Sequence, residues 1–143
     1  MEDIRDNLKK FEEKKNRAAE ACGRKGEEVL LVAVSKTRTP EEINKAIDAG
    51  VTDIGENKVQ EIMEKFDAVK PVRWHMIGHL QRNKVKYIID KVDMIHSVDS
   101  IRLAGEIDKR AGACGRVMDV LVQINPALEE SKFGVSIDDA GPL

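Results

Sequence analysis

The sequence predicts an α/β fold built around a parallel sheet, on three observations. Short apolar segments alternate along the chain with amphipathic segments that have the spacing of helices. One strand and its following helix occupy about 20 to 26 residues, which suits successive βα units joined by right-handed crossovers. The chain has 143 residues, of which 41% are hydrophobic, so it is long enough for one domain with a buried core.

The predicted elements follow one another in a regular order. An amphipathic helix over residues 3–22 comes first, and Gly23 is typical of the residue that ends a helix. Strands are predicted at 29–35, 51–55, 73–77, 93–97 and 118–124. Helices are predicted between them at 40–49, 57–68, 81–90 and 100–111. No linker or change of composition interrupts this order, so residues 1–143 form a single predicted domain.

The first predicted strand is the most apolar segment of the chain, with six apolar residues in a row at 29–34. Such a run, half of it valine, is typical of a strand that is buried on both faces. Thr39, Pro40 and Glu42 then have the positions of an N-cap, a first helical residue and the acidic partner in a capping box. Lys36 therefore lies on the loop at the carboxyl end of the strand, where α/β proteins place their functional sites.

Lys36 is the first candidate site residue. Desolvation and a neighbouring cation such as Arg38 favour a neutral amine, and a neutral amine attacks carbonyl carbons. On position alone, the alternative is a solvated loop lysine without a chemical role. The position indicates a candidate nucleophile and leaves that alternative open.

Polar residues follow the other predicted strands as well, so every strand delivers such groups to the same end of the sheet. They are Glu56 and Asn57, Gly78 and His79, Ser97 and Asp99, and Asn125. Asn57 is the second candidate. With Gln60 three residues later it fits a helix N-cap, and it also lies where a ligand would be contacted. One side chain can serve both roles.

Three histidines, His75, His79 and His96, are further candidates. His75 and His96 fall within predicted strands, where histidines are usually hydrogen-bonded residues of a core or barrel lining. They lack the His-x-His or His-Glu-x-x-His spacing of zinc sites, so we predict no metal ligand among them.

Composition excludes several classes of partner. The formal charge is −2 and charges of both signs are interspersed, which argues against a nucleic acid or a membrane surface. The amino terminus lacks the features of a signal peptide, and no apolar run approaches the roughly 20 residues that span a bilayer. Cys22 and Cys114 are isolated in sequence and predict reduced thiols in a cytoplasmic protein.

Four motifs carry a resemblance to a known family. They are AVSKT at 33–37, GENKVQE at 55–61, WHMIGHLQRNK at 74–84, and QIN at 123–125 with SKFG at 131–134. In this order and with this spacing they are similar to those of the pyridoxal phosphate homeostasis proteins, which are single-domain relatives of the alanine racemase barrel. The resemblance covers nearly the whole chain, to about Asp139.

The resemblance implies a fold and a function. The fold would be a (β/α)8 TIM-type barrel, the alanine racemase-like fold type III, in a cytoplasmic protein. The cofactor would be pyridoxal 5′-phosphate (PLP), held as a Schiff base on Lys36 with Asn57 beside it. The implied role is PLP homeostasis, through buffering of the cofactor and its delivery to PLP-dependent client enzymes, with little or no catalytic turnover.

The length of the chain departs from this family. A complete barrel needs about 250 residues and eight strands, and loops after the last two strands commonly hold a phosphate. Only five strands are predicted here. We therefore expect a domain that is incomplete at its C-terminal end and retains the cofactor weakly. Its unpaired fifth strand would favour association with another chain.

Two alternative functions stay open. A PLP-dependent enzyme acting on amino acids, such as a racemase, would need a second acid/base residue across the cofactor, and the sequence offers no convincing candidate. A metal-dependent barrel hydrolase would use the three histidines, and metal analysis of the purified protein would distinguish it.

Overall fold

The computed structural model describes residues 3–143, and its strands form a five-stranded parallel sheet. The strands lie in the order β1-β2-β3-β4-β5, so each pairs with the next one in sequence. The predicted α/β fold with five parallel strands is confirmed. The strands are Ala33–Val34 (β1), Asp53–Glu56 (β2), Arg73–Met76 (β3), Met94–Val98 (β4) and Asp119–Val122 (β5).

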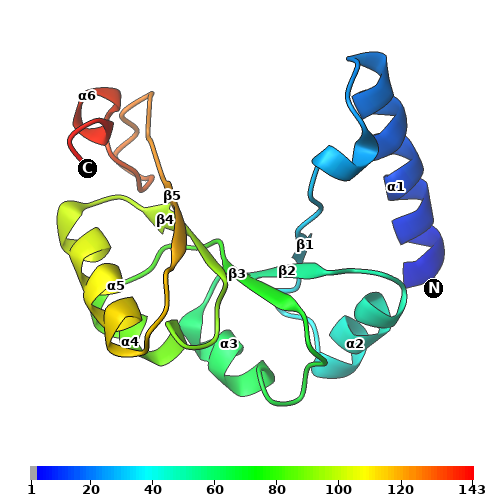
Figure 1. Ribbon diagram of the computed structural model, residues 1–143, viewed down its shortest axis with the longest axis horizontal. Helices are drawn as coiled ribbons and strands as arrows, with labels where there is room; N and C mark the ends of the chain where they lie inside the picture. The colour runs from blue at the N-terminus through cyan, green and yellow to red at the C-terminus, as the bar shows by residue number, and fades with distance from the viewer. Residues whose placement is uncertain (1–2) are drawn as a thin grey trace.

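Helices connect the strands and, from α2 to α5, lie along one side of the sheet (Figure 1). The result is an open, curved arrangement of successive βα units, like part of a barrel. The helix α1 lies at one end of this arrangement, and the short α6 lies at the other. The helices are Ile4–Ala21 (α1), Pro40–Asp48 (α2), Val59–Lys65 (α3), Val85–Ile88 (α4), Ile101–Ala113 (α5) and Ile137–Ala140 (α6), with 3-10 turns at Gly26–Glu28 (η1) and Arg82–Lys84 (η2).

The main core lies between the sheet and these helices. Alternate strand residues face it, and those of β2, β3 and β4 are at most 3% exposed: Ile54, Trp74, Met76 and Ile95. They belong to one cluster with buried helix residues, which are Ile43, Ile62, Val85, Ile88, Leu103 and Ile107. Because side chains alternate along a strand, the residues between them, such as Gly55 and His75, belong to the opposite face.

The start of α2 follows its sequence signal. Thr39 accepts a hydrogen bond from the Glu42 N–H, and the Glu42 carboxylate accepts one from the Thr39 N–H. Pro40 occupies the first helical position, so the predicted capping box is confirmed. The helix therefore begins at a defined point, four residues after Lys36.

The first strand differs from its prediction. β1 has two residues instead of the seven predicted at 29–35, and it is not buried on both faces, since Leu30 is 53% and Val34 is 54% exposed. In this sheet β1 has only β2 as a neighbour. Its other edge therefore lacks the pairing and packing that a central strand receives.

Three other elements differ from their predictions by more than a residue or two in length or are divided. The helix predicted at 57–68 runs from Val59 to Lys65, and the one predicted at 81–90 divides into η2 and α4. The strand predicted at 118–124 ends at Val122, and Ile124 forms an isolated bridge with Val135 instead. That bridge brings the segment around residues 131–135 back beside the sheet.

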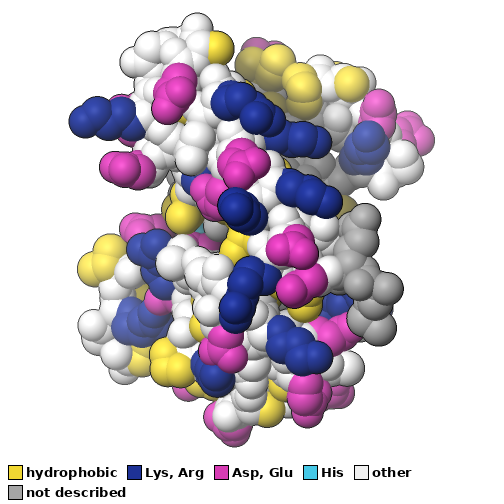
Figure 2. All heavy atoms as spheres, turned by 90° about the vertical axis from the view of Figure 1, so that its right-hand side faces the viewer, with side chains coloured by type: hydrophobic (Ala, Val, Ile, Leu, Met, Phe, Trp, Pro, Cys, Tyr) yellow, Lys and Arg dark blue, Asp and Glu magenta, His cyan; other side chains and the backbone are white. Residues whose placement is uncertain are grey.

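Figure 2 shows the side of the molecule on which α1 lies, and basic and acidic side chains are interspersed over it. A surface of this kind creates no strong field of one sign. Within residues 3–143, no helix combines the length and the apolar composition needed to cross a membrane.

Candidate functional site

Lys36 lies on the short loop between β1 and α2, at the carboxyl end of β1. Its side chain is exposed, so the desolvation expected at this position is not found, and it takes part in none of the ion pairs formed within residues 3–143. The next residue, Thr37, has a φ of 64°, in the left-handed region that branched side chains rarely adopt. The loop therefore depends on specific contacts to keep its shape.

Those contacts come from the two residues beside Lys36. Ser35 donates its N–H to a carbonyl of β2 at 2.9 Å, and its hydroxyl donates to the Glu56 carboxylate. Thr37 donates its N–H to Oε1 of Glu61 at 2.8 Å. Groups from β2 and α3 thus hold the backbone on both sides of Lys36.

The ammonium group of Lys65 joins these contacts in the core. It donates to the Ser35 carbonyl at 3.0 Å, to Oε2 of Glu56 at 3.1 Å and to Oε1 of Glu61 at 3.0 Å. Glu56 is 0% exposed and Lys65 is 7% exposed. A buried carboxylate needs a positive partner because an unpaired buried charge is strongly destabilising, and Lys65 supplies that partner.

The Glu61 carboxyl group is held in its charged form. The hydrogen bond from the Thr37 N–H lowers its pKa, burial opposes this, and the contact with Lys65 lowers the pKa further, so that the net change is downward. Glu61 is therefore an ionised acceptor at neutral pH. Hydrogen bonds to ionised acceptors are stronger than those between neutral groups, which strengthens its hold on Thr37.

Asn57 follows β2 and is half-buried, at the strand end where the sequence places it. The prediction that it caps the next helix is wrong. The helix α3 begins at Val59, its N-cap residue is Lys58, and no side chain makes a capping hydrogen bond there. The helix starts one residue later than an Asn57 cap requires. A contact between Asn57 and a cofactor stays a prediction.

The backbone of Asn57 lies against Gly78, which follows β3. A side chain at Gly78 would overlap the Asn57 backbone, so glycine is required there by space. The segments that directly follow β2 and β3 therefore approach each other closely at Asn57 and Gly78.

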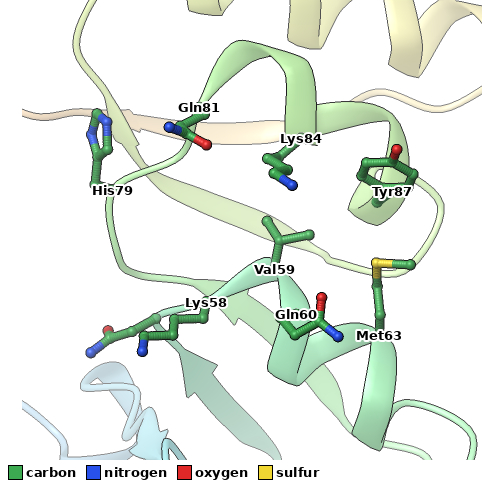
Figure 3. Close-up of a pocket in the computed structure, with 9 residues that line it drawn as sticks. Lys58, Val59, Gln60, Met63, His79, Gln81, Lys84 and Tyr87 are labelled. Carbon is green, nitrogen blue, oxygen red and sulfur yellow. The ribbon is translucent and has the colours of Figure 1, made fainter.

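A groove of about 470 Å³ opens beside Asn57, between α3 and the η2–α4 segment (Figure 3). In Figure 3, Lys84 extends into the groove, and Tyr87 and Met63 face each other at one end. The lining consists of amide, basic, aromatic and apolar residues: Asn57, Lys58, Val59, Gln60, Met63, His79, Gln81, Lys84 and Tyr87. The groove is therefore polar and basic beside Asn57 and more apolar at the end that holds Met63 and Tyr87.

His79, at the end of β3, stacks on Phe133 with ring centroids 3.6 Å apart and planes at 12°. Phe133 belongs to the SKFG motif, which follows β5. Asn125 holds that segment, since its side-chain amide donates to the Glu129 carbonyl at 2.8 Å. The motif at 74–84, which contains His79, and the motif at 131–134, which contains Phe133, thus meet at the same end of the sheet.

His75 and His96 form a hydrogen-bonded chain with Asp53. His75 Nε2 lies 2.7 Å from Oδ2 of Asp53, and His75 Nδ1 lies 2.8 Å from His96 Nε2. Burial raises the pKa of Asp53, but hydrogen bonds, that of His75 foremost, hold it below its ordinary value. Burial, and then the neighbouring His75, lower the pKa of His96. An ionised Asp53 can only accept, so the hydrogen bond between Asp53 and His75 is donated by His75 Nε2.

These histidines do not form the site that a metal-dependent hydrolase would require. His75 and His96 contact each other, whereas His79 stacks on Phe133. In the part of the chain that the structure describes, no group of three or more His, Cys, Asp or Glu side chains is placed to hold a metal ion. The hydrolase alternative therefore has no support from the geometry of the site.

The sequence placed Lys36 correctly at the end of a strand, but it did not indicate the residues that hold its loop. Glu61 and Lys65 are four residues apart on a helix, a spacing that is equally common on solvated helix surfaces. The available signal was Glu56, which directly follows a predicted buried strand, because a carboxylate in such a position requires a partner. The partner itself could not be identified without the tertiary structure.

Comparison with known proteins supports the family resemblance that the four sequence motifs carry. No family model matches the chain. A pyridoxal phosphate homeostasis protein from Aquifex aeolicus is 43% identical over 140 residues, which are 96% of this chain and 61% of that protein. A protein of the same name from Escherichia coli K12 is 38% identical over an alignment 148 positions long, which covers 100% of this chain and 63% of that protein.

Solved structures show the same relationship. An unknown protein from Bifidobacterium adolescentis matches with a TM-score of 0.85 and 38% identity, over 96% of this chain and 61% of that one. PipY of Synechococcus elongatus PCC7942, solved with PLP bound, matches with a TM-score of 0.72 and 34% identity, over 87% of this chain and 59% of PipY. This chain, a partial barrel, is therefore similar to the pyridoxal phosphate homeostasis proteins over most of its own length, and it spans about three fifths of the length of the relatives it matches.

Proposed function

We propose that this chain binds pyridoxal 5′-phosphate as a Schiff base on Lys36 and takes part in PLP homeostasis without catalytic turnover. The observation that carries the proposal is Lys36 itself, an exposed amine at a strand end, on a loop whose two neighbouring residues are held in place. The similarity of the chain to pyridoxal phosphate homeostasis proteins, and to PipY with PLP bound, supports the proposal.

Lys36 offers the chemical group with which an aldehyde cofactor reacts. A primary amine condenses with an aldehyde and releases water, which requires a neutral amine with room to approach the carbonyl carbon. Lys36 has that room because its side chain is exposed. Asn57 and His79 lie at the ends of the next two strands, and we assign Asn57 the position beside the cofactor.

The proposed role is to hold PLP and release it to PLP-dependent client enzymes in the cytoplasm. A Schiff base is covalent but reversible, so it can retain a reactive aldehyde and still give it up to another amine. Cys22 and Cys114 are free thiols, which suits a reducing compartment.

The test is to titrate the purified chain with PLP, reduce it with borohydride and locate the adduct by peptide mass spectrometry. We expect the adduct on Lys36 and its loss in Lys36→Ala. Lys45→Ala, which removes an exposed lysine of α2, is the matched control and should keep the adduct. An adduct spread over many surface lysines would contradict the proposal. Racemisation of amino acids by the loaded protein would favour the enzyme alternative.

A further inference from the structure

We propose that Glu61 and Lys65 of α3 are positioning residues for Lys36, which fix its loop from the side of the core. They act through Thr37 and Ser35, the residues on either side of Lys36. This inference rests on the proposed function, because it concerns how the same site is held.

The contact with Thr37 stabilises an unfavourable backbone conformation. A φ of 64° is costly for a β-branched residue and persists only where the surroundings hold it. The Glu61 carboxylate provides that restraint by accepting the Thr37 N–H at 2.8 Å, across 24 residues of sequence. Without this acceptor, we expect the Thr37 backbone to relax and the direction of the neighbouring Lys36 side chain to change with it.

The contacts with Ser35 fix the other side of the loop. Lys65 donates to the Ser35 carbonyl at 3.0 Å, while the Ser35 hydroxyl donates to Glu56. Ser35 is 4% exposed, so these charged groups replace the water that an open loop would bind. The backbone that enters the loop is therefore tied to the core by its carbonyl and its side chain together.

Stability alone does not account for this charged cluster. Replacing a buried ion pair with apolar residues of similar size is often neutral or stabilising. The neighbouring core is apolar, with Ile54 at 1% and Ile62 at 0% exposure, so an apolar pair would suit these surroundings. An apolar pair could not bind the Ser35 carbonyl, nor could it hold the Glu61 carboxylate beside Thr37.

The cluster also leaves Lys36 free. Lys65 is the positive partner of both carboxylates, at 3.1 Å from Glu56 and 3.0 Å from Glu61. Neither carboxylate therefore needs Lys36 as a counter-ion, and its amine stays available. Lys65 thus holds the loop, and the loop presents Lys36.

The experiment compares Glu61→Ala, Glu61→Gln and Glu64→Ala by two measurements. Glu61→Gln keeps an oxygen that can accept the Thr37 N–H, and Glu64→Ala is the matched control, because Glu64 is an exposed residue of the same helix that contacts Gln60. Hydrogen exchange of the Thr37 amide reports on the loop without any cofactor. The rate of borohydride-trapped PLP adduct formation on Lys36 reports on the site, and thermal unfolding confirms that each variant is folded.

We expect Glu61→Ala to exchange the Thr37 amide about tenfold faster and to form the Lys36 adduct at least about tenfold more slowly. Glu61→Gln should restore most of both properties, and Glu64→Ala should change neither. Faster exchange with unchanged adduct formation, or Thr37 exchange equal to that of the parent chain, would overturn the positioning role. If the parent chain forms no adduct on Lys36, the proposed function fails, and Thr37 exchange still decides whether Glu61 holds the loop.

Discussion

Gly78 packs directly against the backbone of Asn57, so the turns after β2 and β3 share a contact without any side chain between them. A Cβ atom at Gly78 would lie 2.8 Å from the Cα of Asn57 and 2.9 Å from its carbonyl carbon. Backbone atoms cannot yield as a flexible side chain can, so one of the two turns would have to move.

We therefore expect Gly78→Ala to lower the free energy of unfolding by about 1 to 3 kcal/mol, the usual cost of overpacking. Because Asn57 lies in one of these two turns, PLP retention should weaken as well. Urea denaturation and PLP titration measure the two effects.

Gly112→Ala is the matched control. Gly112 lies in α5, and a Cβ there would meet nothing within 4 Å. Alanine in a helix is more favourable than glycine by about 0.5 to 1 kcal/mol, so this variant should be slightly more stable. A Gly78→Ala variant as stable as the parent chain would contradict the close contact.

Asn57→Ala should separate binding from stability. No side chain caps α3, so the substitution should change the free energy of unfolding by less than about 0.5 kcal/mol. PLP affinity, measured by absorbance titration, should fall. Unchanged affinity would show that Asn57 has no contact with the cofactor.

The control for Asn57 is Ser100→Ala, at the start of α5. Ser100 Oγ accepts a hydrogen bond from the Leu103 N–H at 3.0 Å and is a true N-cap. Its loss should cost about 1 kcal/mol without an effect on PLP.

His96 should make stability depend on pH just below neutrality. The folded protein lowers the pKa of His96 through burial and the adjacent His75, so the unfolded chain binds a proton more readily than the folded one. Its contribution to stability is complete above the unfolded pKa of about 6.5 and is lost as the pH falls from there toward the lower folded value. The free energy of unfolding, measured by urea denaturation, should therefore decrease from about pH 7.5 to pH 5.5.

His96→Asn should flatten this pH dependence, because it removes the group whose pKa differs between the two states. His79→Asn is the control, since His79 lies exposed at the end of β3 and stacks on Phe133. That variant should keep the slope of the parent chain. Equal slopes for the parent chain and His96→Asn would rule out His96 as the source.

The outer edge of β5 should drive self-association. Leu121 is 47% exposed on a strand whose only neighbour in this sheet is β4. A lysine on an edge strand opposes pairing with another chain, so Leu121→Lys should weaken association measured by light scattering and sedimentation. Val117→Lys is the control, because Val117 is 95% exposed but lies outside the strand. If both variants associate as the parent chain does, β5 is not the interface.

The sequence was a good guide where the structure depends on local chemistry. Thr39, Pro40 and Glu42 predicted the start of α2 correctly because a capping box is formed by residues close in the chain. Lys36 was placed at a strand end for a similar reason, since the strand, loop and helix follow one another directly.

The sequence was a poor guide where the outcome depends on which segments become neighbours. The apolar run at 29–34 predicted a central strand, but β1 lies at an edge of this sheet and remains partly exposed. Asn57 and Gln60 had capping-box spacing, yet α3 starts one residue too late to use it. The role of Lys65 depends on contacts with Ser35 and Glu56, which are 30 and 9 residues away in sequence.

The sequential order of the strands has a consequence for how the chain folds. Paired residues lie between 19 residues apart, as for His75 and Met94, and 25 residues apart, as for Met94 and Asp119. Each new strand therefore closes a loop of modest, nearly constant length, and the entropic cost of doing so is similar at every step. A sheet of this kind can grow one βα unit at a time from the amino terminus, in the direction in which a ribosome releases the chain. The contacts that hold the Lys36 loop all lie within residues 35–65, so this site can be assembled before the second half of the sheet has been synthesised.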